Sequence, residues 1–154
     1  MGIFTGMNAT ASALTAQRLR MDVISSNMAN ADSTRARMVG PDTWEPYRRK
    51  TVVLQPNEGS FANFLQAAAG KRGMSKAGDG VRVTSIEEDR ATPFKTVYDP
   101  EHPDANEDGY VQMPNVDPLR EMVDLLSATR SYEANVTVFN ASKGMMMKAL
   151  EIGK

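Results

Sequence analysis

The sequence predicts an α+β protein with long N- and C-terminal helices, paired as a coiled-coil-like helical layer, and a β-rich irregular middle domain. Near both ends of the chain, apolar residues recur at alternating spacings of three and four, as in helices that pack along one seam. All eight prolines lie between Pro41 and Pro118, together with the short β-branched runs. The expected boundaries are an N-terminal assembly helix at 1–33, a variable middle domain at 34–115 and a C-terminal assembly helix at 116–154.

The N-terminal helix is predicted from a seam that begins at Ile3 and ends at Ala31, with Thr10 and Gln17 as its interruptions. The seam residues that we expect to form an assembly interface are Met7, Leu14, Met21, Ile24 and Met28. Many positions beside the seam hold glycine, alanine or serine, where an exposed helix usually carries charged residues. Such small side chains permit further helices to approach closely.

The end of this helix is predicted in the sequence "MANADS" at 28–33, at Asn30. Asn30 and Asp32 tolerate a left-handed backbone and can bond to their own main chain, so Asn30 is a candidate C-terminal helix cap. An ordinary polar loop after an ordinary helix fits the segment about as well. Both interpretations stay open at this point.

The middle domain contains four runs that are typical of strands. "KTVVLQ" at 50–55 and "VRVTSI" at 81–86 are the clearest, and "FKTVY" at 94–98 and "YVQM" at 110–113 follow. Turn-forming proline, glycine and aspartate separate these runs, so we expect short strands joined by irregular segments.

The C-terminal helix is predicted to start in "NVDPLREM", with Asp117 as the N-cap, Pro118 in the first helical position and Glu121 in the first turn. Thr129 and Lys143 interrupt its seam. The seam residues expected in the assembly interface are Met122, Leu125, Tyr132, Val136, Phe139, Met146 and Leu150. The Met-rich end can repack against different neighbours because thioether side chains are unbranched and flexible.

The two terminal helices are expected to be only marginally stable by themselves. Ordering the backbones of these helices has an entropic free-energy cost. Burial of one narrow apolar seam on each helix provides a stabilising free energy of only about the same size. We therefore expect these helices to be poorly ordered in the free subunit and to fold when many subunits pack side by side.

Composition excludes several function classes. The formal net charge is −1, so there is no overall basic field for nucleic acid, and the cluster Arg48-Arg49-Lys50 is expected to be a solvated face. No apolar run approaches the ~18 residues of a membrane span. There is no cysteine for disulfides, thiolate catalysis or Cys-based zinc sites. The first residues lack the basic and apolar regions of a secretory signal peptide.

The sequence contains few candidates for metal-binding or catalytic residues. In "DANEDG", Asp104, Asn106 and Asp108 match the first half of an EF-hand loop, but Asn115 stands where the bidentate glutamate belongs. A solvated turn is the favoured interpretation, and a weak calcium-binding module centred on residues 104–109 is kept as an alternative. A small hydrolase would depend on His102, the one histidine. We expect no enzyme, no cofactor, no metal ligands and no catalytic or cofactor-binding residues.

Two stretches resemble axial proteins of the bacterial flagellum. The stretch 12–34, "SALTAQRLRMDVISSNMANADST", resembles their N-terminal rod signature, in which a long helix ends in an Asn-Ala turn. The stretch 99–154 is similar almost end to end to the C-terminal half of the proximal rod proteins of the basal body. Its most specific motifs are "GYV" at 109–111, "PNV" at 114–116, "RSY" at 130–132 and the Met-rich tail. Residues 58–80 look longer than the usual connection in that family, so the fold of this segment is not predicted.

The resemblance implies a mechanical function. In such rod proteins the terminal helices line up with those of neighbouring subunits as the inner tube of a hollow, torque-transmitting drive shaft, and the middle segment forms the outer layer. The implied partners are further copies of the chain, other proximal rod proteins, the rod-base adaptor and the distal rod. The implied location is the basal-body rod in the cell envelope and periplasm, after export through the flagellar type III apparatus without a cleaved signal peptide. Another rod or hook-junction axial subunit is the alternative within this class.

Overall fold

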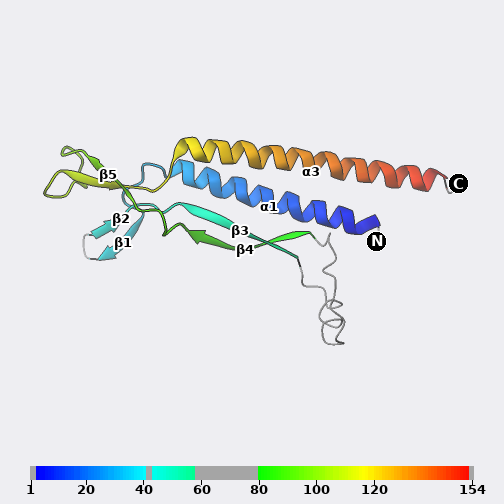
Figure 1. Cartoon of the computed structure of the whole chain (residues 1–154), viewed down its shortest axis with the longest axis horizontal. Helices are drawn as coiled ribbons and strands as arrows, with labels where there is room; N and C mark the ends of the chain where they lie inside the picture. Colours follow the sequence, from blue (N-terminus) through cyan, green and yellow to red (C-terminus); the bar gives the residue numbers. More distant parts are fainter. Residues whose placement is uncertain (1–2, 41–42, 58–79, 153–154) are drawn as a thin grey trace, which may run out of the picture. The chain divides into compact units, whose positions relative to one another are not determined.

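The computed structural model describes residues 3–40, 43–57 and 80–152 of the chain. It confirms the predicted α+β class, with a helix at each end and strands between them (Figure 1). The helices are α1 (Ile3–Ala29) and α3 (Pro118–Ile152). The strands are β1 (Arg37–Gly40), β2 (Thr43–Glu45), β3 (Lys50–Pro56), β4 (Val81–Glu88), β5 (Lys95–Tyr98) and β6 (Tyr110–Met113). The segment 58–79, whose fold the sequence left open, lies outside the described residues.

The described strands form three two-stranded sheets, β1-β2, β3-β4 and β5-β6. The four strands predicted from the sequence correspond to β3, β4, β5 and β6 and are confirmed. Strands β1 and β2 were not predicted, because both are short and largely exposed and carry no alternating pattern. The β1-β2 pair is antiparallel, and its register shifts between Met38 and Gly40. The β5-β6 pair is antiparallel and regular from Lys95↔Met113 to Tyr98↔Tyr110.

The chain divides into two compact units, and both helices contribute to each of them. The junction unit comprises the described residues within 20–52 and 86–127. The terminal unit comprises the described residues within 1–19, 53–85 and 128–154.

Most of the buried apolar side chains belong to the junction unit. Those found there are Val23, Ile24, Tyr47, Val111 and Val116. In the described part of the terminal unit the buried apolar residues are Ala16 and Ala128. The single chain thus forms a small core in the junction unit, whereas the buried apolar side chains in the described part of the terminal unit are two alanines.

Both predicted cap residues make hydrogen bonds at helix ends. The Asn30 side chain donates from Nδ2 to the carbonyl of Ser26 at 2.9 Å and accepts at Oδ1 from the Ser33 hydroxyl at 3.2 Å. At the other boundary, Asp117 Oδ1 accepts the backbone N–H of Leu119 at 3.1 Å. The first of these bonds satisfies a carbonyl in the last turn of α1, and the second satisfies a donor in the first turn of α3.

Among the described residues, neither helix has a stretch that is both long and apolar enough to cross a bilayer.

Candidate assembly interface and its buried polar junction

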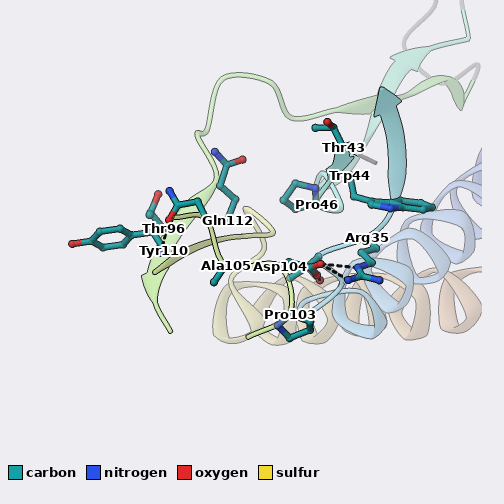
Figure 2. Close-up of a pocket in the computed structure, with 12 residues that line it drawn as sticks. Arg35, Thr43, Trp44, Pro46, Thr96, Pro103, Asp104, Ala105, Tyr110 and Gln112 are labelled. Carbon is teal, nitrogen blue, oxygen red and sulfur yellow. Dashed lines mark hydrogen bonds and ion pairs between the residues drawn. The ribbon is translucent and has the colours of Figure 1, made fainter. Parts of the chain in front are cut away.

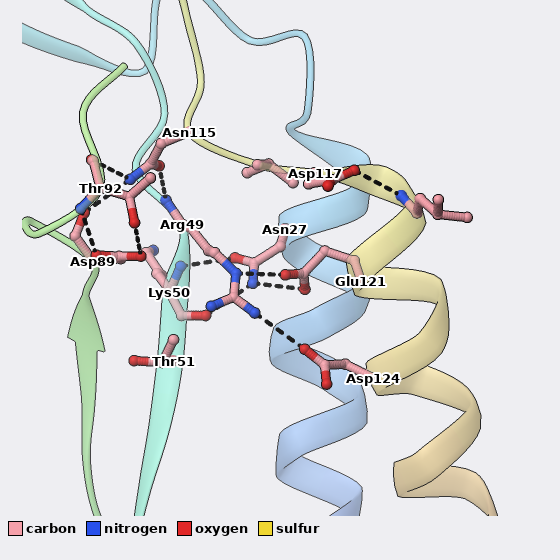
Figure 3. A network of polar contacts seen from close by, with 12 residues as sticks. Asn27, Arg49, Lys50, Thr51, Asp89, Thr92, Asn115, Asp117, Glu121 and Asp124 are labelled. Atoms are coloured by element: carbon pink, nitrogen blue, oxygen red, sulfur yellow. Dashed lines mark hydrogen bonds and ion pairs between the residues drawn. The ribbon is translucent and has the colours of Figure 1, made fainter. Parts of the chain in front are cut away.

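A buried polar network links α1, β3 and α3 within the junction unit (Figure 3). Asn27 of α1 is at its centre, with a side chain that is 1% exposed. Its Oδ1 accepts the backbone N–H of Lys50 at 2.9 Å and the hydroxyl of Tyr47 at 3.0 Å. Its Nδ2 donates to the Lys50 carbonyl at 2.8 Å and to Glu121 Oε2 at 3.0 Å. Both donors and both acceptor positions of the Asn27 amide are therefore hydrogen-bonded, and this side chain joins α1 to the start of β3.

Glu121 of α3 is the second member of the network and is fully buried. Its Oε1 accepts from Arg49 Nε at 2.6 Å, and the Arg49 side chain is only 13% exposed. Arg49 also donates from Nη2 to Asp124 at 3.2 Å, and Arg20 lies 3.7 Å from the same carboxylate. A buried charge pair of this kind is expensive to desolvate, and removal of one partner costs about 3–5 kcal/mol because the other charge is left buried.

Asn115 binds the backbone of Arg49, whereas Glu121 and Asp124 bind its side chain. Asn115 is 5% exposed, and its Oδ1 accepts the backbone N–H of Arg49 at 2.7 Å. Its Nδ2 donates to the carbonyls of Asp89 and Thr92, at 2.9 and 3.1 Å. Asn115, between β6 and α3, therefore joins the residue that precedes β3 to the loop that follows β4.

That loop is shaped by the carboxylate of Asp89. Its Oδ1 accepts the backbone N–H groups of Ala91 and Thr92, both at 3.0 Å, and its Oδ2 accepts the Thr92 hydroxyl at 2.8 Å. These hydrogen bonds from Thr92 and Ala91 lower the pKa of Asp89, because they stabilise the ionised carboxylate. The ionised side chain presents the carbonyls of residues 89 and 92 to Asn115.

The expectation that Arg48-Arg49-Lys50 is a solvated face is wrong. Arg49 is in the buried network, and Arg48 pairs with Glu45 at 2.6 Å and lies 4.3 Å from the centre of the Phe94 ring. Asn27 and Asn115 were not predicted as members of this network. One signal was available for Asn27, because Ala16, Val23 and Asn27, spaced seven and four residues apart, lie on one helix face next to the predicted seam, and inward-facing polar residues are normally hydrogen-bonded.

The predicted interface residues are only partly covered in the single chain. Ile24 is buried, whereas Met122 and Leu150 are 45% and 76% exposed. The others are intermediate in exposure; they are Met7, Leu14, Met21, Met28, Leu125, Tyr132, Val136, Phe139 and Met146. Of the four buried positions described in α1, Ile24 lies on the predicted seam, whereas Ala16, Val23 and Asn27 lie beside it. A role for the seam in contacts between subunits stays a prediction.

Further apolar side chains of α3 are exposed in the single chain. They are Leu119, Val123, Leu126, Val138, Met145, Met147 and Ile152. Ile152 is 86% exposed and Leu119 is 68% exposed. Exposed apolar surface of this extent on one element is typical of a site that another protein covers.

The EF-hand-like loop is occupied by the protein's own donors. Asp104 accepts from Arg35 at 2.6 Å and from the Thr34 hydroxyl at 2.8 Å. Hydrogen bonding and the charge of Arg35 lower the pKa of Asp104, and the same contact raises the pKa of Arg35. Asn106 Oδ1 accepts two backbone N–H groups, from Asp108 and Tyr110, at 3.1 and 2.7 Å. These oxygens stabilise a turn, and the described residues contain no group of three acidic, His or Cys side chains that could hold a metal ion.

The Arg35–Asp104 pair lies in an open groove of about 680 Å³, shown in Figure 2. Trp44, Tyr110 and Gln112 are among the other residues that line it. His102 is near this loop, where its Nδ1 accepts the backbone N–H of Asp104 at 3.1 Å. The groove brings together a paired arginine and aspartate with aromatic and amide side chains, and the Thr34 hydroxyl in its lining donates to the same aspartate, Asp104.

Comparison with known proteins identifies the family. Residues 7–37 match the family model described as flagella basal body rod protein, and residues 107–152 match that of the flagellar basal body rod FlgEFG protein C-terminal region. Over the full length of both chains, the protein is 60% identical to the flagellar basal-body rod protein FlgC of Bacillus subtilis and 46% identical to that of an Escherichia coli strain. It is 44% identical to FlgC of Borreliella burgdorferi, over 99% of this chain and 98% of the relative. The chain therefore belongs to the FlgC family of flagellar basal-body rod proteins.

Proposed function

We propose that the chain is a structural subunit of the proximal rod of the flagellar basal body, and that it assembles through its terminal helices into a hollow, torque-transmitting shaft. The observation that carries the proposal is identity of 60% over the full length with a flagellar basal-body rod protein. The exposed apolar residues of α3, such as Leu126 at 62% exposure, support assembly through the helices.

The predicted domain roles fit this function. Residues 1–33 and 116–154 act as the assembly helices, and residues 34–115 form the variable outer part. Torque passes through contacts between subunits, so many helix contacts of modest strength share the load. The buried polar network ties both helices to the middle segment in the junction unit, so a force on either helix is carried into the same body.

The proposed partners are further copies of the chain and the other proximal rod proteins, with the rod-base adaptor and the distal rod at the two ends. The subunit is proposed to reach the cell envelope through the flagellar type III export apparatus, without a cleaved signal peptide. The role is mechanical and requires no cofactor. A weak calcium module at 104–109 is not favoured, because Asp104 and Asn106 already hold internal donors.

Leu126→Asp tests the interface in a strain whose own copy of the gene is deleted. Leu126 is exposed in the single chain, so the variant should fold and be exported but fail to build rods in purified basal bodies seen by electron microscopy. Ser127→Asp is the matched control, because it adds the same charge at the next exposed position without removing an apolar side chain. Normal rods with Leu126→Asp, or equal failure of both variants, would contradict an apolar contact at this position.

Location within the basal body is a separate question. Electron microscopy of the same particles should place density for the chain between the membrane ring and the distal rod. Density at the hook junction would instead support the alternative, another axial subunit of the same class.

A further inference from the structure

We propose that Gly80 and Ser12 form a latch within the chain that fixes the start of β4 against α1 in the terminal unit. The proposal does not depend on the function proposed above. Ser12 is in the third turn of α1, and Gly80 immediately precedes β4. The two residues are 68 positions apart in the sequence, so only the fold brings them together.

The Ser12 hydroxyl makes the polar half of the latch. It donates to the carbonyl of Ala9 at 2.7 Å and accepts the backbone N–H of Val81 at 3.0 Å. Serine hydroxyls inside helices commonly bond back to the preceding turn and satisfy only the helix itself. Here the same oxygen also receives the first N–H of a strand, so one side chain joins two elements.

Gly80 makes the steric half. Its backbone has φ +85°, a conformation that favours glycine. A Cβ at this position would overlap Ser12 Oγ and would lie 3.2 Å from both Ala9 Cα and Ser12 Cβ. The backbone of residue 80 therefore touches the surface of α1 directly, and any side chain would push the strand away from the helix.

Gly80 also reaches the other strand of its sheet. Its carbonyl accepts the backbone N–H of Asn57, just beyond the end of β3, at 3.0 Å. The ends of β3 and β4 are thus both joined to the residue that contacts α1. We infer that this end of the β3-β4 pair and α1 around Ala9–Ser12 move as one body.

The latch changes the interpretation of the small residues on α1. From the sequence alone, such positions are expected to allow the close approach of further helices. At Ala9 and Ser12 the close approach is made instead by the chain's own Gly80. A neighbouring subunit that packs on this part of α1 would meet the β3-β4 pair as well as the helix.

Other glycines of the chain supply the controls. A Cβ at Gly6 or Gly144 would have no heavy atom within 4 Å, so alanine is expected to be tolerated at both helical positions. Gly109 has a similar backbone, with φ +78°, but its Cβ would meet Tyr98 and Pro100, which are far from α1 in sequence and belong to the junction unit. Gly109→Ala thus introduces the same backbone strain as Gly80→Ala without disturbing the latch.

Amide hydrogen exchange of the full-length chain, followed by NMR, tests the latch. Gly80→Ala and Ser12→Ala should each accelerate exchange of the Val81 amide by at least about ten-fold, and Gly80→Ala should also accelerate exchange in α1 near Ser12. Gly109→Ala should leave these amides unchanged. Equal rates in Gly80→Ala and the unmodified chain, or equal acceleration by Gly109→Ala, would overturn the proposal.

A distance measurement provides a readout that does not depend on overall stability. The chain has no cysteine, so spin labels can be placed uniquely by Thr15→Cys on α1 and Thr84→Cys on β4, two exposed positions. Electron spin resonance should give one narrow distance distribution, which broadens with Gly80→Ala and stays narrow with Gly109→Ala. A broad distribution in the chain that retains Gly80 and Ser12, or an unchanged one with Gly80→Ala, would contradict the latch.

Discussion

The junction unit and the terminal unit contain parts of the same two helices, but the helices are stabilised differently in each. In the junction unit, the buried Asn27 is hydrogen-bonded to Lys50 at the start of β3 and to Glu121, and the buried Glu121 pairs with Arg49, next to a small apolar core. In the terminal unit, the buried apolar residues among those described are Ala16 and Ala128, and large side chains such as Leu150 are exposed. The stability of one continuous helix therefore varies along its length.

Because of this difference, we do not expect the terminal helices to be poorly ordered along their whole length in the free subunit. A helix segment whose polar and apolar groups are satisfied within one chain does not need a neighbour for its order. A segment with large exposed apolar side chains gains its burial only from other molecules. We therefore expect the sequence-based argument to apply to the distal part of α3, at 140–152, and to fail near residues 20–29 and 118–127, and also near Ser12, where α1 is bonded to the start of β4.

The largest expected difference is in amide protection along α3 in the free subunit. Opening free energies should be higher at 118–127 than at 140–152 by on the order of 5 kcal/mol, because only the first segment is held by a buried network. Native-state hydrogen exchange of a verified monomer measures this difference. Uniform protection along the whole helix would show that the two units are equally stable without neighbours.

Removal of the Glu121 carboxylate should have the next largest effect. Glu121→Ala leaves the Arg49 guanidinium without its buried partner and should lower the free energy of unfolding by about 3–5 kcal/mol. Glu133→Ala is the control, since Glu133 makes an exposed ion pair with Arg130 and its loss should cost less than about 1 kcal/mol. Urea denaturation measures the loss in the free energy of unfolding for both variants. Losses of similar size would mean that the buried Glu121–Arg49 pair stabilises the fold no more than an exposed pair does.

Asn27→Ala should destabilise the junction unit by about 2–3 kcal/mol. The change leaves the buried N–H and C=O of Lys50 and the hydroxyl of Tyr47 without this partner. Asn8→Ala on the exposed surface of the same helix should be neutral or slightly stabilising, because alanine has the higher helix propensity. Chemical denaturation compares the two, and a loss at Asn8 as large as that at Asn27 would be inconsistent with the network.

The cap of α1 should have a smaller effect. Asn30→Gly removes the side-chain bonds to the Ser26 carbonyl and the Ser33 hydroxyl and should cost about 1 kcal/mol. Asp32→Gly, at an exposed position of the same turn, serves as the control and should cost less. If Asn30→Gly proves as stable as the unmodified chain in thermal unfolding, the backbone conformation alone carries the cap, as the left-handed interpretation predicts.

The smallest effect is expected at the surface pair Arg35–Asp104. Because Arg35 lowers the pKa of Asp104 in the folded state, the pair stabilises the fold above the ordinary carboxyl pKa of about 3.9. This contribution should be lost as the pH falls through the lowered pKa, and high salt should weaken it. An NMR titration of the Asp104 carboxyl should give a pKa below its ordinary range, and Arg35→Gln should return it toward that range. An unshifted carboxyl in the unmodified chain would contradict the contact.

The elements with local signals could be predicted from the sequence alone. The three-four spacing near both ends predicts α1 and α3, and "VDPLRE" predicts the start of α3 at Pro118, where Asp117 accepts the N–H of Leu119. The β-branched runs predict β3 to β6. Such patterns are readable because helix and strand periodicity and capping depend on residues only a few positions apart. The flagellar resemblance, which also rests on local motifs, was confirmed by full-length relatives.

Which polar residues are buried, and which partners they bond, depends on the three-dimensional fold. Glu121 was correctly placed in the first turn of α3, but its partner Arg49 is 72 positions away and was expected to be solvated. Asn27 and Ser12 each have a partner 23 or more positions away, and the strands β1 and β2 exist through pairing with each other. The sequence around an arginine, glutamate or asparagine does not tell whether its side chain is solvated or buried. Burial of such a side chain is favourable only when the fold supplies a hydrogen-bond donor or acceptor from a distant part of the sequence. Such contacts between distant residues are a property of the whole fold and cannot be predicted from a short stretch of the sequence.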